Sequence, residues 1–391
     1  MKSIPNPLRQ PTKGPEPRRI LSDRGIVEAI GQGLLRSTPS IDLSENSRRV
    51  QPASLDVTFN RIVEAEDLGD KGMLGNQNLQ RGFPAEALTT FELSELIDFG
   101  QLRQGFGPLF LGVSSEARSS LRTLGCYIPH PGYFFSGPEQ STLEIANFSK
   151  NSIAIEQGER VAQLFLQVFP FQDIRYSGNG RKSERGELIR SLEMGVNIHS
   201  KTQIRALEQQ GYLEVFPRLN FQQHSLLVHA SSKAYRLKEI DGGISFSERK
   251  NYSFSDLWEK IDISGGVEIR PFDHIFIETV ESFSLSEHVG IRFWDNIPHS
   301  FNPLQRHMKN VPDLFENVGL ISLTDGWVDP GYRGGFSRQP KWMTRRVIYP
   351  GDVVGMGEVF FFPNGVQNPY GSRERGSQYQ ESRNRLTEQV G

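Results

Sequence analysis

Residues 51–60 read Gln-Pro-Ala-Ser-Leu-Asp-Val-Thr-Phe-Asn, and this stretch decides how the rest of the chain is interpreted. Its pattern predicts a β-strand that carries a Ser-x-Asp motif, formed by Ser54 and Asp56. Three more motifs follow: a turn, a strand with one carboxylate, and a return strand. Each motif is short and is a weak signal alone, but four such motifs in this order are rarely met by chance. The three are Arg118-Ser-Ser-Leu-Arg122, Ser141-Thr-Leu-Glu-Ile-Ala-Asn147 and Gly158-Glu-Arg-Val-Ala-Gln-Leu164.

The bulk properties are those of a soluble enzyme. A chain of 391 residues is long enough for two or three domains. The net charge of −2 creates no general field that would favour nucleic acid or a membrane surface. Cys126 is the single cysteine, which excludes an intramolecular disulfide and fits a reducing compartment, so we expect a cytoplasmic protein. No apolar run approaches the roughly 18 residues that a membrane-spanning helix needs.

The composition and its changes along the chain predict an arm and two modules. Residues 1–19 are rich in Pro, Lys and Arg, which is typical of a disordered arm. Residues 20–177 form the first module, which opens with a short helix that we expect to run from Ser22 to Leu35. Residues 178–194 form a charged, Gly-rich linker, and residues 195–385 form a second module. Abundant Gly and Pro suit many short strands joined by tight turns.

The second module repeats the first in faint matches that keep their order. We therefore predict a mainly β fold built from tandem duplicated modules with short helices. The alternative is that short matches containing Gly and Pro recur in any β protein. The matches are Ser22-Asp-Arg-Gly-Ile26 with Ser200-Lys-Thr-Gln-Ile204, Ser54-Leu-Asp-Val57 with Ser225-Leu-Leu-Val228, Pro131-Gly-Tyr133 with Pro330-Gly-Tyr332, and Glu156-Gln-Gly-Glu159 with Tyr349-Pro-Gly-Asp352.

The two copies differ at the motif residues, so their chemistry cannot be equal. The second copy has lost most of the polar motif residues, which points to a catalytic first module and a degenerate second one. Leu227 stands for Asp56, Gln339 for Glu144, residues 296–317 for the arginine turn, and Asp329 is an acid where the first copy has His130.

In these motifs the chain resembles the dCTP deaminase/dUTPase superfamily of nucleotide hydrolases, over residues 20–382. It is most similar to the long, two-module bacterial dCTP deaminases, which also carry a segment like Leu257-Trp258-Glu259. Residues 369–382 resemble the C-terminal segment that covers the triphosphate in those enzymes. The resemblance implies a compact dUTPase-like fold of the β-clip type. It also implies active sites at contacts between copies, usually in homotrimers.

Several positions depart from the pattern of this superfamily. Gln378 replaces a usual Lys, and Glu381-Ser382 stand where Gly-Gln is usual. Thr123 occupies the place of the second basic residue of the arginine turn, so Arg122 is the candidate substitute. His130 weakens a dUTPase interpretation, because that branch uses an Asp near this position to activate water. Asp329 could supply such an acid only from the second module.

Deamination of cytosine requires water to add at C4, a proton to reach the leaving amine, and stabilisation of the tetrahedral adduct. One carboxylate can carry that proton if burial raises its pKa. Glu144 lies in the apolar run Leu143, Ile145, Ala146, so it is the candidate catalytic residue. The alternative is an ordinary surface Glu on an edge strand.

A triphosphate needs several donors, and we expect Mg²⁺ to be held by its oxygens and by water, with no direct protein ligand. A zinc deaminase is disfavoured because one cysteine cannot supply the Pro-Cys-x-x-Cys site, so we expect no zinc. Supporting roles are predicted for Ser54, Asp56 and His130. The predicted substrate-binding residues are Arg118, Ser119, Ser120, Arg122, Thr142, Gln163, Asp329, Tyr370, Gln378, Tyr379 and Gln380.

The interpretation is therefore a dCTP deaminase that forms dUTP for pyrimidine deoxynucleotide synthesis. Two alternatives stay open. One is a dUTPase or a bifunctional enzyme that converts dCTP to dUMP. The other is a non-catalytic nucleotide-binding or structural relative. The expected partners are dCTP or dUTP and further copies of the chain, with no nucleic-acid polymer and no membrane.

Overall fold

The protein is described by a computed structural model that places residues 19–43, 49–67, 82–98, 106–110, 126–127, 135–137, 140–147, 149–168, 191–198, 200–217, 220–222, 225–248, 251–269, 273–294, 326–338 and 346–372. The elements of the first half of the chain are β1 (Arg19–Leu21), α1 (Asp23–Gly31), β2 (Arg36–Thr38), β3 (Val50–Gln51), β4 (Ser54–Asp67), β5 (Gly82–Phe83), β6 (Ala87–Leu93), β7 (Leu96–Asp98), β8 (Phe106–Phe110), β9 (Cys126–Tyr127), β10 (Phe135–Gly137), β11 (Gln140–Asn147), β12 (Ile153–Ala154) and β13 (Arg160–Val168).

The second half continues with the same kinds of element. They are β14 (Met194–Ile198), α5 (Lys201–Gln209), β15 (Leu213–Phe216), β16 (Asn220–Gln222), β17 (Ser225–Leu237), β18 (Ile244–Ser245), α6 (Phe254–Leu257), β19 (Trp258–Asp262), β20 (Val267–Ile269), β21 (Ile275–Leu285), β22 (Val289–Trp294), β23 (Gly326–Val328), β24 (Arg333–Arg338), β25 (Arg346–Ile348) and β26 (Val353–Phe361).

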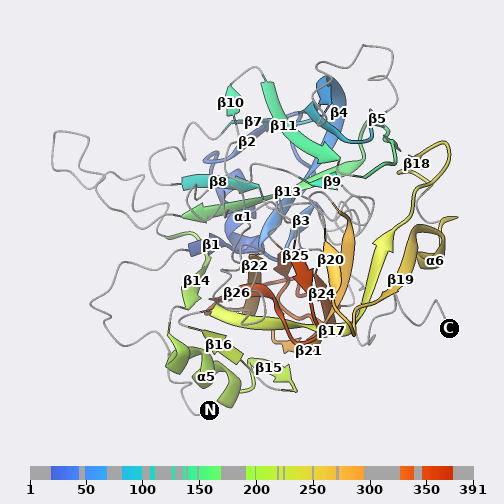
Figure 1. The fold of residues 1–391 in the computed structure, drawn as a ribbon. Helices are drawn as coiled ribbons and strands as arrows, with labels where there is room; N and C mark the ends of the chain where they lie inside the picture. The colour runs from blue at the N-terminus through green and yellow to red at the C-terminus, as the bar shows by residue number, and fades with distance from the viewer. Residues whose placement is uncertain are drawn as a thin grey trace, which may run out of the picture.

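The fold is mainly β, as the sequence predicts. The described strands pair antiparallel, except that β12 pairs with β18 in parallel. In Figure 1 the blue-to-green strands of the first half lie above the yellow-to-red strands of the second half, and β18 reaches up beside the first half. No described helix is long and apolar enough to cross a membrane.

The two halves begin in the same way, with a short strand and then a helix. Each opens with a nine-residue helix after a serine, Ser22 before α1 and Ser200 before α5. Each helix is followed by a glycine in the left-handed region, Gly33 at φ 67° and Gly211 at φ 74°. Since such a conformation ends a helix, α1 stops at Gly31 rather than at Leu35 as the sequence had suggested.

The long strands repeat with the same register. In the first half β4 pairs with β13, and in the second half β17 pairs with β26. The turn before each return strand contains a glycine at φ 88°, Gly158 in the first copy and Gly351 in the second. The duplication predicted from faint sequence echoes is therefore present in the backbone.

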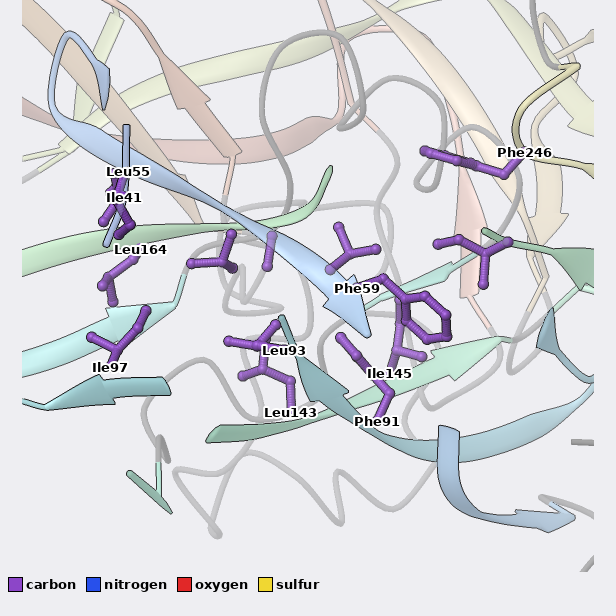
Figure 2. Packing of buried hydrophobic residues seen from close by; sticks show 14 of the residues in the cluster. Ile41, Leu55, Phe59, Phe91, Leu93, Ile97, Leu143, Ile145, Leu164 and Phe246 are labelled. Atoms are coloured by element: carbon purple, nitrogen blue, oxygen red, sulfur yellow. The ribbon is translucent and has the colours of Figure 1, made fainter. Parts of the chain in front are cut away.

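Three hydrophobic cores hold the halves, and two of them mix residues from both. The first packs Leu55, Phe91 and Leu164 of the first half with Phe246 and Trp258 of the second. Figure 2 shows this cluster, with side chains of β4, β6 and β11 at the centre and Phe246 of the second half at its edge. The second core belongs to the second half alone. The third joins Ile20, Ala53 and Phe165 to Trp327, Phe360, Phe362 and Val366.

A short parallel strand pair forms a second joint between the halves. Ile244 N–H donates to Ser152 O at 2.8 Å, and Phe246 N–H donates to Ala154 O at 2.8 Å. Next to it, the Asn151 side chain accepts from Ile240 N–H at 2.6 Å and donates to the carbonyl of Lys238 at 2.8 Å. Residues 238–246 of the second half thus add β18 to the edge of the small sheet that contains β12 of the first half.

The second half also contains a buried hydrogen-bonded pair, Tyr235 and Glu278. The Tyr235 hydroxyl donates to Glu278 Oε1 at 3.1 Å. Burial, and then the charge and hydrogen bond of Glu278, raise the pKa of Tyr235 well above its ordinary value. The phenol therefore stays a donor throughout the physiological range, and the contact belongs to the core rather than to a titrating site.

Candidate active site

The Ser-x-Asp strand places a fully buried carboxylate at the start of β4. Asp56 Oδ2 accepts from Gln51 Nε2 at 3.0 Å and from Arg160 Nη1 at 3.2 Å. Asp56 has no exposed surface, while the Arg160 side chain is 30% exposed. A buried carboxylate is stable only when paired and hydrogen-bonded, and the arginine reaches from this pair toward the surface.

Gln163 lies directly opposite Asp56 in the pairing of β13 with β4. Residues opposite each other share a face of the sheet, as do residues two apart, so Ser54 belongs to the same face. Gln163 and Ser54 are buried. The Oε1 atom of Gln163 and the Oγ atom of Ser54 have no hydrogen-bond partner among the described residues. Buried polar atoms in this state are suited to a ligand.

A second carboxylate supports the strand behind Asp56. Glu95 is buried and accepts from Arg49 Nη2 at 2.5 Å, from Thr58 N–H at 3.0 Å and from the Thr58 hydroxyl at 2.8 Å. Arg49 Nε in turn donates to the carbonyl of Asp56 at 2.9 Å. The network fixes the backbone on both sides of the Asp56 position.

The second copy keeps this support but not the polar site. His229 corresponds to Thr58 by register, and its N–H and Nδ1 contact Glu281 at 2.8 Å and 2.6 Å. Glu281 therefore repeats the position of Glu95. The second copy keeps this carboxylate although it has lost the polar site. We therefore interpret Glu95 and Glu281 as residues that stabilise the fold of their own copies and take no part in the chemistry. The corresponding site positions are apolar: Leu227 for Asp56, Met356 for Gln163 and Val353 for Arg160.

The second module covers the face that carries Asp56 and Gln163. Phe165, two residues beyond Gln163 on that face, lies with its ring centroid 5.3 Å from that of Trp327. Trp327 Nε1 donates to Asp329 Oδ1 at 3.0 Å, and Asp329 is buried. The structure thus brings Ser54, Asp56 and Gln163 together and places the predicted acid Asp329 at the interface that adjoins them.

Glu144 lies elsewhere in the same chain. It is in β11 between the buried residues Leu143 and Ile145, opposite Thr90 of β6, which in turn is opposite Glu64 of β4. Glu64 is eight residues along β4 from Asp56, roughly 25 Å at about 3.3 Å per residue. The pairing of the strands therefore places Glu144 beside the far end of β4 and Asp56 at its start.

The remaining predicted residues divide into two groups. Thr142 is half-buried and opposite Glu92. Tyr370 is 6% exposed, with its ring centroid 5.6 Å from that of Tyr332, so it is packed against the second module. The predicted residues outside the described part of the chain are Arg118, Ser119, Ser120, Arg122, His130, Gln378, Tyr379 and Gln380.

Sequence reasoning left several residues of the cluster unassigned. Arg160 stands in the return-strand motif, and Gln51 stands three residues before Ser54, so both signals were available. Glu95 carries no local signal, since its counterpart Glu281 has different neighbours in the sequence. Within the described residues, no group of three or more His, Cys, Asp or Glu side chains is arranged to hold a metal ion.

Comparison with known proteins defines the class of fold and then the family. A crystal structure of 2'-deoxycytidine 5'-triphosphate deaminase from Agrobacterium tumefaciens matches with a TM-score of 0.59 and 14% identity, over 92% of this chain and 99% of that one. A curated protein from Sulfurihydrogenibium sp. (strain YO3AOP1), named as a dUMP-forming dCTP deaminase, is 30% identical over 157 residues. They make up 37% of this chain and 81% of that protein. No protein-family model matches the chain. The chain belongs to the dCTP deaminase/dUTPase superfamily.

Proposed function

We propose that this chain is a dCTP deaminase that hydrolyses the 4-amino group of dCTP to give dUTP and ammonia. The observation that carries the proposal is the asymmetry of the duplicated strands. The first copy keeps Asp56, Arg160 and Gln163, whereas the second has apolar residues at all three positions. A member of this superfamily that had lost nucleotide chemistry altogether would have no reason to retain one buried polar site and relinquish the other.

The reaction assigns one acid–base role to Glu144. Water adds to C4 of the base as Glu144 accepts a proton from it. The same carboxyl group then gives that proton to the 4-amino nitrogen and ammonia leaves, and the remaining hydroxyl proton moves to N3, so that C4 becomes a carbonyl. Glu144 lies between Thr142 and Ala146 on one face of β11, and the buried Ala146 suits this role, because an apolar neighbour on the same face disfavours the charged carboxylate.

Ser54, Asp56, Arg160 and Gln163 form the polar cluster. We propose that this cluster lies at the part of the active site that binds the triphosphate. The partly exposed Arg160 offers donors, to which Arg118, Ser119, Ser120 and Arg122 of the arginine turn would add theirs. The Asp56 carboxylate is already taken up by Gln51 and Arg160, so the described residues suit phosphate rather than a metal ion. Mg²⁺ would arrive with the triphosphate and shield its charge.

The distance between Glu144 and the Asp56 cluster leads to a further part of the proposal. If both act on one nucleotide, their places at opposite ends of β4 favour two different copies of the chain as their source, so the active enzyme would be a homo-oligomer, with a trimer the first candidate. Mixing Glu144→Gln chains with Asp56→Asn chains tests this. Activity in the mixture that neither variant has alone supports shared sites, and its absence argues against them.

A second candidate product is dUMP. The curated relative from Sulfurihydrogenibium is named as a dUMP-forming enzyme, and Asp329 adjoins the proposed phosphate side. Incubation with dCTP and Mg²⁺, read by chromatography of nucleotides and by a pyrophosphate assay, separates the two. Accumulating dUTP supports simple deamination, and dUMP with pyrophosphate supports the bifunctional enzyme. Binding of dCTP without any product would favour a non-catalytic relative.

Removal of the C-terminal residues should separate a covering role from a structural one. A chain that ends at Ser372 is expected to have a raised KM and a lowered kcat for dCTP with an unchanged Tm, because the packed residue Tyr370 remains. A chain that ends at Asn368 also loses Tyr370 and should melt at a lower temperature. Steady-state kinetics and calorimetry measure both. Full kcat/KM after truncation at Ser372 would mean that the tail does not cover the nucleotide.

The second copy should stay inactive when only its carboxylate is restored. Gln339→Glu is expected to leave the number of active sites per chain unchanged, because Leu227, Met356 and Val353 offer no group that could hold a phosphate. Titration with a tight-binding dCTP analogue gives the count. Two sites per chain in the variant would show that the asymmetry has been misjudged.

A further inference from the structure

The strand that carries Glu144 is paired so that one residue of the neighbouring strand lies directly opposite it. In the pairing of β11 with β6 this residue is Thr90, and Thr90 in turn lies opposite Glu64 of β4. Residues in such a row share one face of the sheet, with neighbouring Cβ atoms about 5 Å apart. Thr90 is half-buried and Glu64 is exposed, so the row lies on a face that the described part of the chain leaves partly open.

The second copy has the corresponding row with different residues, because Tyr235 of β17 lies opposite Phe276 of β21. The alignment of β4 with β17 gives Tyr235 in place of Glu64. The alignment of β6 with β21 gives Phe276 in place of Thr90. Two buried aromatic residues therefore replace an exposed carboxylate and a half-buried hydroxyl.

Two more rings cover this row in the second copy. Trp258 of β19 has its ring centroid 5.7 Å from that of Phe276, and Phe254 of α6 has its centroid 6.1 Å from the same ring. Phe254 and Trp258 stack on each other at 5.9 Å, with 7° between their planes. The described part of the first copy has no counterpart of α6 or β19. The space that these rings occupy in the second copy thus corresponds to the open face above Thr90 in the first.

An acid beside the row is kept in both copies, as Glu92 in the first and Glu278 in the second. Glu92 accepts from Arg61 Nε at 2.6 Å and from Arg61 Nη2 at 2.8 Å, and this arginine side chain is 70% exposed. Glu278 instead accepts from the buried Tyr235 hydroxyl at 3.1 Å. The acid is therefore held from the solvent side in the first copy and by an aromatic residue of the row in the second.

We propose that Thr90 is a binding residue for the pyrimidine base of the nucleotide, and that Phe254 and Trp258 fill the corresponding space in the second copy. The inference rests on the proposed function, because a base whose C4 reacts beside Glu144 must lie over the same face of the sheet. Thr90 is the described residue directly opposite Glu144 on that face. A pyrimidine is a flat ring, like the stacked rings that this face accepts in the second copy.

The test copies residues of the second copy into the first. Thr90→Phe places a ring where the base would lie, so it is expected to weaken dCTP binding by about 10–100-fold, the range that one base contact is usually worth. Calorimetric titration with dCTP measures the affinity. The matched control is Thr38→Phe, since the offset that aligns Gly33 with Gly211 gives Phe216 for Thr38, and both of these side chains are exposed. The control should bind dCTP like the wild type, and wild-type affinity in Thr90→Phe would overturn the proposal.

Two further variants separate base binding from effects on the fold. Thr90→Leu adds less volume and takes the place of Thr90→Phe if that chain does not fold. Phe276→Thr, the reverse exchange in the second copy, should lower the Tm because buried ring contacts are lost, and should leave dCTP affinity unchanged. An equal loss of dCTP affinity in Phe276→Thr and Thr90→Phe would overturn the proposal, since both would then act through the fold. Weaker dCTP binding by Thr90→Phe, in a protein that binds dCTP without releasing ammonia, would support the role of Thr90 and contradict the proposed function.

Discussion

Glu144→Gln is expected to lower dCTP turnover by about 10²–10⁴-fold, the usual effect of losing a general acid–base group. The amide keeps the shape of the side chain but can neither accept the proton of water nor return it to the amine. Binding of dCTP should stay within a few-fold, because the phosphate donors are on other strands. Ammonia release under steady-state conditions gives the rate, and calorimetric titration with dCTP gives the affinity.

The matched control is Glu259→Gln, which changes an exposed glutamate on β19 in the same way. It should leave both rate and affinity unaltered. Turnover of Glu144→Gln at the wild-type rate would remove Glu144 from the mechanism. A loss of dCTP affinity as large as the loss of rate would instead assign it to binding.

Much of the architecture could be predicted because duplication leaves ordered traces in the sequence. The glycine of each return turn is a local requirement of a left-handed turn, so it persists in both copies, and a serine precedes the helix in both, although only Ser22 caps its helix with the side chain. The offset that aligns Gly158 with Gly351 also carries Arg160 to Val353 and Gln163 to Met356. The loss of the whole polar site in the second copy was therefore readable from the sequence.

The contacts between modules could not be predicted in this way. The tilted ring contact of Trp327 with Phe165 and the pairing of β18 with β12 join residues far apart in the chain, with no shared motif to indicate them. The equivalence of Glu95 and Glu281 could not be recognised in the sequence for a related reason. Each acid satisfies the backbone of a neighbouring strand, and that task constrains its position in space rather than the residues beside it.

The comparison of the two copies also leads to a prediction about stability, which concerns the free energy of unfolding of an Asp56 variant. Asp56→Leu is expected to destabilise the protein by about 3 kcal/mol, since the buried guanidinium and amide contacts of Arg160 and Gln51 lose this acceptor. We place the loss at the low end of the range for buried pairs because the Arg160 side chain is 30% exposed. The Tm should fall by roughly 4 °C, because 391 residues at about 2.1 cal/mol/K each give an unfolding entropy of about 0.8 kcal/mol/K, and calorimetry would measure the shift.

Asp56→Leu combined with Arg160→Val and Gln163→Met should recover most of that loss. These are the residues that the second copy places at the three positions, where the same pairing of strands is stable without any polar partner. Replacing a whole buried ion pair by apolar residues is often neutral, whereas removing one member is not. The triple variant should therefore be folded, close to wild type in Tm, and unable to bind dCTP. If it melts no higher than Asp56→Leu alone, the polar cluster is required by the packing of the first module, and its retention there says nothing about nucleotide chemistry.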